Sequence, residues 1–139
     1  MWPPHAPVEP EALVKLEYIP AGAPNCPLIR LYDFTSAEAC HLQAAVSGLA
    51  SGRTERVEVD LLPFVEAVGG CRLALVRRKW DQAAIACGRD NEFECGLTAG
   101  SWEDVSELIK PFAEGANGFQ WLAGVPGEAA LLLSPTGQW

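Results

Sequence analysis

The side chains that could act as a nucleophile or a base are few, and they lie far apart in the sequence. Of the two histidines, His41 follows Cys40 in a predicted helix, where neighbouring residues point about 100° apart. These two residues are therefore not expected to form a nucleophile–base pair. His41 could instead meet Cys71 or Cys95 across the fold, but buried cysteines commonly behave as small, inert hydrophobes. A solvated helix histidine is the preferred interpretation.

A carboxylate offers a second route to catalysis. Asp33 ends a predicted strand directly before a predicted helix, a position that often borders the ligand cleft in parallel α/β folds. The alternative hypothesis is therefore a small enzyme that uses Asp33 or a cysteine in a cleft between helix and sheet. Glu58 and Glu94 are expected on outward strand positions, where pairing with arginine is the ordinary role of a carboxylate.

The sequence lacks the patterns that usually hold a metal or a nucleotide. Cys71, Cys87 and Cys95 lie on three consecutive predicted strands, but structural zinc draws its ligands in pairs about two to four residues apart. Neither G-x-G-x-x-G nor G-x-x-x-x-G-K-[ST] occurs, so no phosphate-binding loop is indicated. We expect no metal site and no cofactor.

Cysteine usage and targeting signals predict the compartment. The chain has five cysteines, an odd count that cannot pair completely within one molecule. Its first residues show no basic start followed by an apolar run, and no apolar stretch approaches the length of a membrane span. Reduced thiols in the cytoplasm, with no membrane partner, are the expectation.

One basic and aromatic cluster stands out as a binding candidate. Arg77, Arg78 and Lys79 form the only basic run, and Trp80 follows them directly. A further tryptophan, Trp139, lies in a tail with turn residues. An exposed tryptophan is a natural interface anchor, because it buries a large area and keeps one polar group. Trp80, Trp139, Arg77 and Arg78 are the predicted binding residues.

Net charge narrows the class of partner. The formal charge of the chain is −8, which repels nucleic acid and anionic membranes at long range. The leading hypothesis is a small acidic protein-interaction or binding module without catalytic activity. Its partner is expected to be another protein or a second copy of itself, since exposed sheet edges can form twofold dimers.

Helix signals are the clearest local features. Thr35 and Glu38 form a T-x-x-E capping box, apolar residues then recur at helical spacing, and Gly52 follows as a stop. A second helix is predicted to start at Ser101, with Asp104 completing an S-x-x-D box and Pro111 bending or ending it.

An alternation of apolar and polar residues with a period of two predicts the strands that position the candidate site residues. The predicted strands are 13–19, 28–34, 53–61, 71–78, 83–87, 93–98, 118–122 and 129–133. The three strands between residues 71 and 98 are joined by short turns, which predicts an antiparallel meander.

These elements predict an α+β fold with a mainly antiparallel sheet. About six to eight strands are expected, with two helices packed on one face. Residues 1–11 are rich in proline and are expected to be a flexible N-terminus, and residues 12–139 to be a single α+β domain. No internal repeat is apparent.

Overall fold

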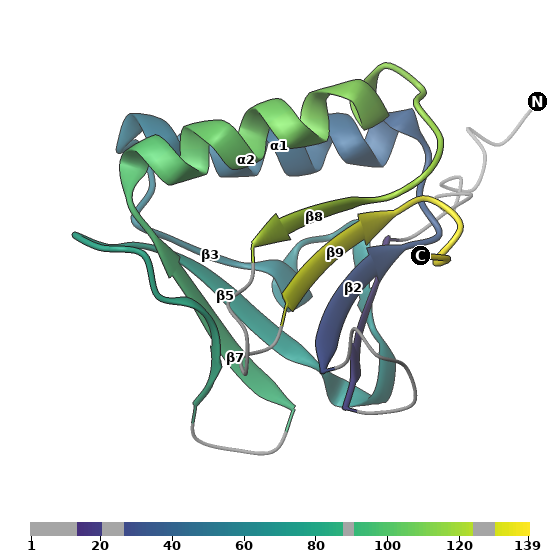
Figure 1. The fold of residues 1–139 in the computed structure, drawn as a ribbon, viewed down its shortest axis with the longest axis horizontal. Helices are drawn as coiled ribbons and strands as arrows, with labels where there is room; N and C mark the ends of the chain where they lie inside the picture. The colour runs from purple at the N-terminus through teal and green to yellow at the C-terminus, as the bar shows by residue number, and fades with distance from the viewer. Residues whose placement is uncertain (1–13, 21–26, 88–90, 124–129) are drawn as a thin grey trace, which may run out of the picture.

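The computed structural model describes residues 14–20, 27–87, 91–123 and 130–139, excluding the side chains of residues 83 and 84. The predicted flexible N-terminus therefore lies outside the described residues. The described part is α+β, as expected, with two helices lying side by side along one end of the strands (Figure 1).

The first helix, α1 (Ser36–Ser51), confirms the predicted start and stop. Its N-cap is Thr35, and the Glu38 carboxylate accepts hydrogen bonds from the Thr35 backbone N–H at 2.7 Å and its hydroxyl at 2.6 Å. Gly52 ends the helix with a φ of 83°, a left-handed conformation that costs glycine little.

The second helix, α2 (Ala99–Ala113), begins earlier than the predicted cap at Ser101. Thr98 is the N-cap, and its hydroxyl accepts a hydrogen bond from the Ser101 N–H at 3.2 Å. The predicted Ser101–Asp104 box is wrong because the helix starts directly where the preceding strand ends. Pro111 lies inside the helix, which continues to Ala113.

Each predicted strand has a counterpart, and one further strand appears. The long strand predicted over 53–61 is interrupted by a 3₁₀ turn at Val59–Leu61, after which the chain forms the unpredicted β4. The strands of the described residues are β1 (Val14–Ile19), β2 (Leu28–Tyr32), β3 (Arg56–Glu58), β4 (Val65–Ala67), β5 (Arg72–Arg77), β6 (Ala83–Ala86), β7 (Glu92–Leu97), β8 (Gln120–Ala123) and β9 (Ala130–Ser134).

The strands form two mixed sheets, which corrects the prediction of one mainly antiparallel sheet. Sheet A has the order β4-β1-β2-β9-β8, and sheet B has the order β3-β5-β7-β6. Three of the pairs are parallel: β1 with β4, β2 with β9, and β5 with β7. The strands divide between two sheets because the chain changes sheet repeatedly. Each helix carries it from one sheet to the other, from β2 to β3 and from β7 to β8, and the 3₁₀ turn after β3 carries it back to β4 in sheet A.

The predicted meander over residues 71–98 is also wrong. β5 and β7 pair in parallel, and β6 pairs with the far side of β7. A parallel pair needs a long crossover, and β6 with its flanking loops supplies it. Residues 78–82 therefore cross the end of β7 on their way from β5 to β6.

The pairing pattern reveals an internal pseudo-twofold that the sequence does not show. One unit consists of β1, β2, α1, β3 and β5, and the other of β6, β7, α2, β8 and β9. Each unit contributes an antiparallel pair, a helix and a second antiparallel pair. The last strand of each unit pairs in parallel with the second strand of the other, β5 with β7 and β9 with β2. Each sheet therefore contains strands from both units.

The two helices follow the same correspondence. Thr35 and Thr98 are their N-caps, and Gly52 and Gly115 lie just beyond their ends with positive φ. Their buried positions also correspond in order: Ala39, Leu42, Val46 and Leu49 in α1, and Trp102, Val105, Ile109 and Phe112 in α2. Because few corresponding residues are identical, the repeat lies in topology rather than in residue identity.

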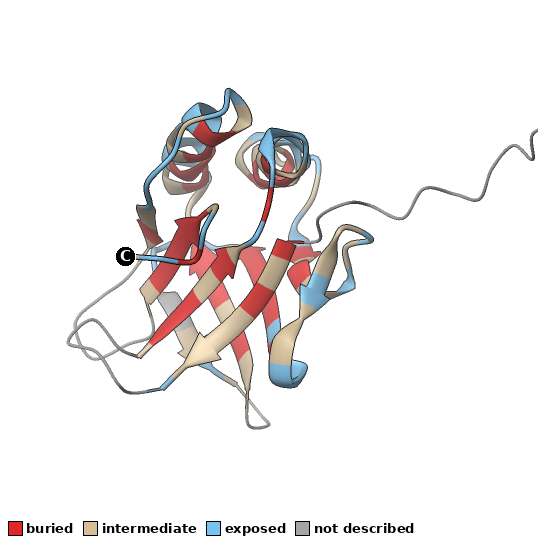
Figure 2. Cartoon of the chain, turned by 90° about the vertical axis from the view of Figure 1, so that its right-hand side faces the viewer, coloured by how far each residue is buried: buried red, intermediate tan, exposed pale blue. Residues whose placement is uncertain are grey.

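One hydrophobic cluster draws on both sheets and both helices. Figure 2 shows the buried residues on the strands and on the inner sides of the two helices. The rings of Tyr18 in β1 and Phe93 in β7 lie 4.5 Å apart and link the sheets. Trp102 is fully buried, and its indole N–H donates to the Val76 carbonyl at 3.0 Å. In the described part of the chain, neither helix has the length and hydrophobicity of a membrane span.

Candidate functional site

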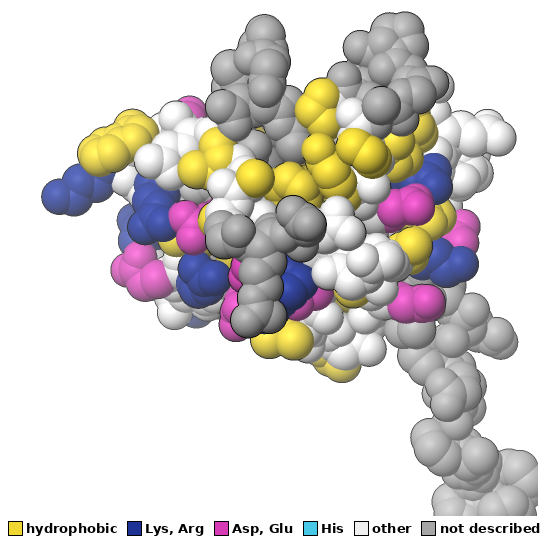
Figure 3. Space-filling view, turned by 90° about the horizontal axis from the view of Figure 1, so that it is seen from below, with side chains coloured by type: hydrophobic (Ala, Val, Ile, Leu, Met, Phe, Trp, Pro, Cys, Tyr) yellow, Lys and Arg dark blue, Asp and Glu magenta, His cyan; other side chains and the backbone are white. Residues whose placement is uncertain are grey.

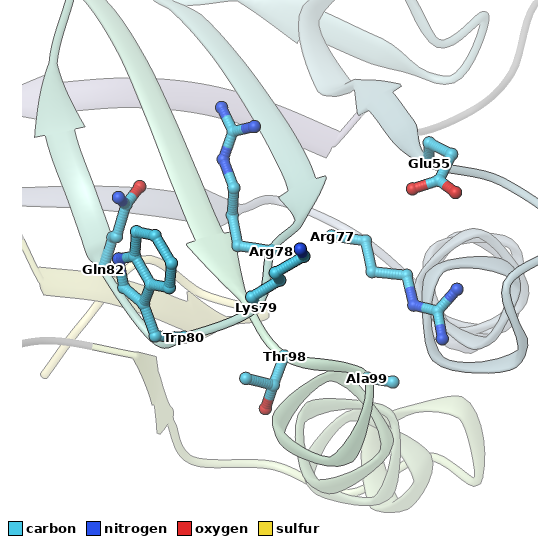
Figure 4. A pocket seen from close by; sticks show the side chains of 8 residues that line it. All are labelled: Glu55, Arg77, Arg78, Lys79, Trp80, Gln82, Thr98 and Ala99. Carbon is cyan, nitrogen blue, oxygen red and sulfur yellow. The ribbon is translucent and has the colours of Figure 1, made fainter.

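A groove of about 790 Å³ lies where β5 and β7 end and α2 begins. This volume falls within the range of about 300–1,000 Å³ that is typical of ligand sites. Figure 4 shows Trp80 and Gln82 side by side in one part of the groove, with Arg77 and Glu55 in another. The lining residues are Glu55, Arg77, Arg78, Lys79, Trp80, Gln82, Thr98 and Ala99.

The loop of residues 78–82 forms the centre of the groove and is fixed at both ends. The Arg78 N–H donates to the Leu97 carbonyl at 2.9 Å, and the Gln82 N–H donates to the Gly96 carbonyl at 2.7 Å. Both acceptors lie at the end of β7, where the loop crosses over it. The loop therefore starts and finishes on the same rigid strand.

Asp81 anchors the middle of this loop to the start of α2. Its carboxylate accepts a hydrogen bond from the Thr98 backbone N–H at 2.9 Å and another from the Ser101 hydroxyl at 2.8 Å. These two bonds, chiefly the one from Thr98, hold the pKa of Asp81 below its ordinary value. A carboxylate is also favourable at the positive end of a helix dipole. These bonds also hold the backbone of the preceding residue, Trp80, in place.

The side chain of Trp80 is 63% exposed. Tryptophan is usually well buried on average, because leaving an indole in water forfeits a large hydrophobic gain. Here the backbone anchors on either side prevent the loop from folding the ring into the core. The fold thus holds a large apolar side chain at the surface, next to the exposed Lys79.

The three cations of the groove differ in their partners. Arg78 pairs with the Glu94 carboxylate, which also pairs with Arg56 at 3.3 Å. These arginines, Arg78 foremost through its hydrogen bond, hold the pKa of Glu94 below its ordinary value. Among the described residues, neither Arg77 nor Lys79 forms an ion pair.

Arg77 is positioned by the end of α1. A methyl group added at Gly52, the C-cap of α1, would lie 2.7 Å from Nη1 of Arg77. The guanidinium therefore lies against the negative end of that helix dipole, which favours a cation. Its charge faces a helix end rather than a carboxylate, so it can still attract an anionic ligand.

The groove brings together three of the four predicted binding residues, Trp80, Arg77 and Arg78. Trp139 lies elsewhere, on sheet A, where it is partly buried. The Arg30 guanidinium lies 3.8 Å from the centre of the Tyr32 ring and 5.9 Å from that of Trp139. Trp139 therefore has a packing role in this cation–aromatic cluster.

The alternative catalytic residues lie in separate environments. Cys71 and Cys95 are buried, and burial raises the pKa of each thiol to about 12. Both are therefore protonated at neutral pH, whereas the thiolate is the nucleophile. Asp33 and His41, by contrast, are exposed at the surface, so they do not share an environment with the two buried thiols.

Asp33 and His41 have ordinary partners. The Asp33 carboxylate pairs with Lys15 at 3.1 Å, and its backbone φ is 61°. The His41 ring lies 5.5 Å from the ring of Phe64. Within the described residues, no His, Cys, Asp and Glu side chains gather in threes as metal ligands would.

Sequence reasoning missed the residues that hold the groove together. Asp81 falls in the predicted turn between strands 71–78 and 83–87, and Thr98 is the last residue of the predicted strand 93–98. The T-x-x-S sequence Thr98–Ser101 directly after a strand is a usable signal for the helix start. The contribution of Asp81 to that start depends on the crossing of β7, which no local pattern indicates.

Comparison with known proteins identifies no relative: no family model, curated protein or solved structure matches this chain.

Proposed function

We propose that this chain is a non-catalytic protein-interaction module that binds an acidic segment of a partner protein in the groove around Trp80. The observation that carries the proposal is the exposed Trp80 side chain on a loop anchored at both ends and in the middle. A ligand that covers this ring recovers the hydrophobic gain that the free protein forgoes. Because the loop is already ordered, binding requires little further ordering of the protein.

The charge of the groove selects the class of partner. Arg77 and Lys79 provide positive charge without a paired carboxylate in the described residues, and Glu55 is the one carboxylate among the lining residues. The net charge of the chain as a whole is −8. On the face away from the helices, by contrast, basic and acidic side chains lie interspersed (Figure 3). An acidic segment is repelled by the net charge of the protein but attracted locally by the groove. Such a pattern favours binding in one place and one orientation.

The proposal can be tested with a labelled acidic probe peptide that alternates glutamate and leucine. We expect Trp80→Ala to weaken its binding about tenfold or more, as loss of a tryptophan anchor does. Lys79→Glu should also weaken binding and reduce its dependence on salt, because fewer charge contacts remain to be screened. Fluorescence anisotropy at several salt concentrations measures both effects.

Two matched variants control for general effects of substitution. Phe119→Ala removes another exposed aromatic ring, 47% exposed, and Lys110→Glu reverses another exposed cation. Neither residue lines the groove, so both variants should bind like the original protein. Equal weakening by the groove and control variants would contradict the proposal. Two other results would also contradict it. One is equal binding of a peptide in which glutamine replaces glutamate, and the other is tighter binding of a single-stranded oligonucleotide at the same residues.

A small enzyme using Asp33 or a cysteine has less support, because the candidate side chains do not converge and both buried thiols are protonated. The described cysteines are free thiols, which suits the proposed cytoplasmic setting. Self-association into a homodimer would use a sheet edge.

A further inference from the structure

The pseudo-twofold of the fold is broken at one place, the outer edge of sheet B. In sheet A, β4 pairs in parallel with β1 and forms the fifth strand. The counterpart of β1 in the second unit is β6, which ends the order of sheet B without such a neighbour among the described residues. Within the part of the chain that the structure describes, sheet B therefore lacks, on this edge, the strand that sheet A has.

The lengths of the connections explain this difference. In the first unit, β4 belongs to the connection between β3 and β5, which runs over residues 59–71. In the second unit, the corresponding connection between β8 and β9 runs only over residues 124–129. The connection of the second unit is thus less than half as long as that of the first.

We infer that the free edge of β6 accepts an extended segment of a partner protein, which adds to sheet B as a fifth strand. The inference rests on the proposed function, because Gln82 lines the groove and directly precedes the first residue of β6. A segment bound at Trp80 can thus continue along this edge. Peptides that add to a sheet edge gain affinity from main-chain hydrogen bonds and specificity from alternate side chains.

The backbone of β6 is suited to this role. The Cys87 N–H donates to the Glu92 carbonyl at 2.9 Å, and Ile85 is opposite Glu94 in the register. Because alternate residues of a strand face opposite neighbours, the N–H groups of Ala84 and Ala86 point away from β7. Natural edges are usually protected by lysine, proline or a bulge. The sequence of β6, Ala-Ala-Ile-Ala, has no charge and no proline.

The strand β4 indicates the chemistry of the occupant. It runs parallel to β1 and reads Val-Glu-Ala, with Glu66 exposed and Val65 and Ala67 partly buried. The expected partner segment therefore runs parallel to β6 and alternates apolar residues with outward acidic ones. Its acidic residues also suit Lys79, which lines the same groove as Gln82 and has no ion pair within the described residues.

The test uses the full chain and a synthetic peptide with the sequence of residues 62–70, which contains β4. Amide NMR spectra and hydrogen exchange are recorded with and without this peptide. At a peptide concentration ten times the Kd, exchange of the Ala84 and Ala86 amides should slow about tenfold. The amides of Ile85 and Cys87, which face β7, should change much less.

Two N-methylated peptides provide matched controls that leave the protein unchanged. The Phe64 carbonyl accepts a hydrogen bond from the Val14 N–H at 2.8 Å, and in a parallel pair the N–H of Glu66 faces the same way. A peptide methylated at the Glu66 nitrogen should therefore lose binding. A peptide methylated at the Val65 nitrogen should bind like the original.

A protein variant gives a second test. Ala86→Pro removes an outward N–H without removing a hydrogen bond to β7, and proline is tolerated on edge strands. It should abolish peptide binding, whereas Ala86→Ser should retain it. If Ala86→Pro fails to fold, the two methylated peptides still test whether the segment adds to β6 as a strand.

Each remaining outcome has a clear meaning. A shift of the Trp80 indole resonance without any change in β6 overturns this inference and leaves the proposed function standing. No response at either place counts against both. Equal binding of the two methylated peptides overturns strand addition. Strong protection of the Ala84 and Ala86 amides in the free protein also overturns it, because the edge would then be covered already, by this chain or by a second copy.

Discussion

At the scale of single residues, the neighbours Trp80 and Asp81 have different roles in the site. Trp80 presents an apolar ring to solvent. Both carboxylate oxygens of Asp81 accept hydrogen bonds that hold the loop to the start of α2. The exposure of Trp80 is therefore a consequence of the hydrogen bonds of Asp81 and of the two loop ends. A residue that touches no ligand can in this way determine the shape of a binding surface.

We predict that Asp81→Asn lowers the free energy of unfolding in a pH-dependent manner. The folded pKa of Asp81 lies below its ordinary value of 3.8, so the carboxylate stabilises the fold at any pH above that ordinary value. This contribution is lost as the pH falls through the lowered folded pKa. The deficit of the variant should be constant between about pH 5 and pH 8 and should shrink in acid.

Urea unfolding at a series of pH values measures this deficit. Asp104→Asn is the control, because Asp104 is an exposed carboxylate of α2 with no hydrogen bond within the described residues. It should show little deficit at any pH. An Asp81→Asn deficit that grows on acidification would contradict the role assigned to this carboxylate.

At the scale of elements, the end of α1 and the end of β5 meet at Gly52 and Arg77. Gly52 is required twice, once for its φ of 83° and once for the space that the Arg77 guanidinium occupies. The helix end thus positions a cation of the groove. Gly52, which the sequence predicts as the end of the helix, therefore also affects the position of Arg77, a groove residue distant from it in sequence.

We expect Gly52→Ala and Gly69→Ala to have similar effects on stability but different effects on binding. Both glycines have positive φ, 83° and 65°, so an alanine costs each about 1–2 kcal/mol. An added methyl at Gly69 meets nothing within 4 Å, whereas at Gly52 it lies 2.7 Å from the flexible tip of Arg77. The tip can move, so the additional cost to stability is small.

The displaced guanidinium should nevertheless weaken binding of the glutamate–leucine peptide in Gly52→Ala and leave it unchanged in Gly69→Ala. Urea unfolding and the anisotropy titration separate the two effects. Equal affinity of both variants for the peptide would show that Arg77 does not contribute to the groove.

At the scale of the whole molecule, the pseudo-twofold makes the two halves of the chain depend on each other. Sheet A joins β1 and β2 to β8 and β9, and sheet B joins β3 and β5 to β6 and β7. One core cluster is shared between both sheets and both helices. Neither half can therefore bury its apolar surface alone.

We predict that residues 1–79 and 80–139, produced separately, do not fold on their own but assemble when mixed. The cut falls in the loop that joins the units and leaves Asp81 with α2. Each fragment alone should show no cooperative thermal transition, because its parallel strand partners are missing. The mixture should recover such a transition and elute as a one-to-one complex.

Circular dichroism and size-exclusion chromatography with light scattering provide the measurements. A cut between residues 104 and 105, inside α2, serves as the control and should prevent recovery. Cooperative folding of either half alone would show that the two units are independent, contrary to the shared sheets.

The sequence by itself determined the local elements. The capping box of Thr35 and Glu38, the apolar stripe that follows it and Gly52 specify α1 within a few residues, and alternation locates most strands. The cluster Arg77, Arg78 and Trp80 could also be named in advance as a binding candidate, because its charge and aromatic character are properties of neighbouring residues.

Only the tertiary structure decided how these elements combine. Alternation is the same for parallel and antiparallel neighbours, so it could not reveal that β5 pairs with β7 or that the strands divide into two sheets. The anchoring of Asp81 to Thr98 and the position of Arg77 against Gly52 join residues distant in sequence. Such contacts depend on how the whole core packs, and local patterns of charge and hydrophobicity carry no information about them.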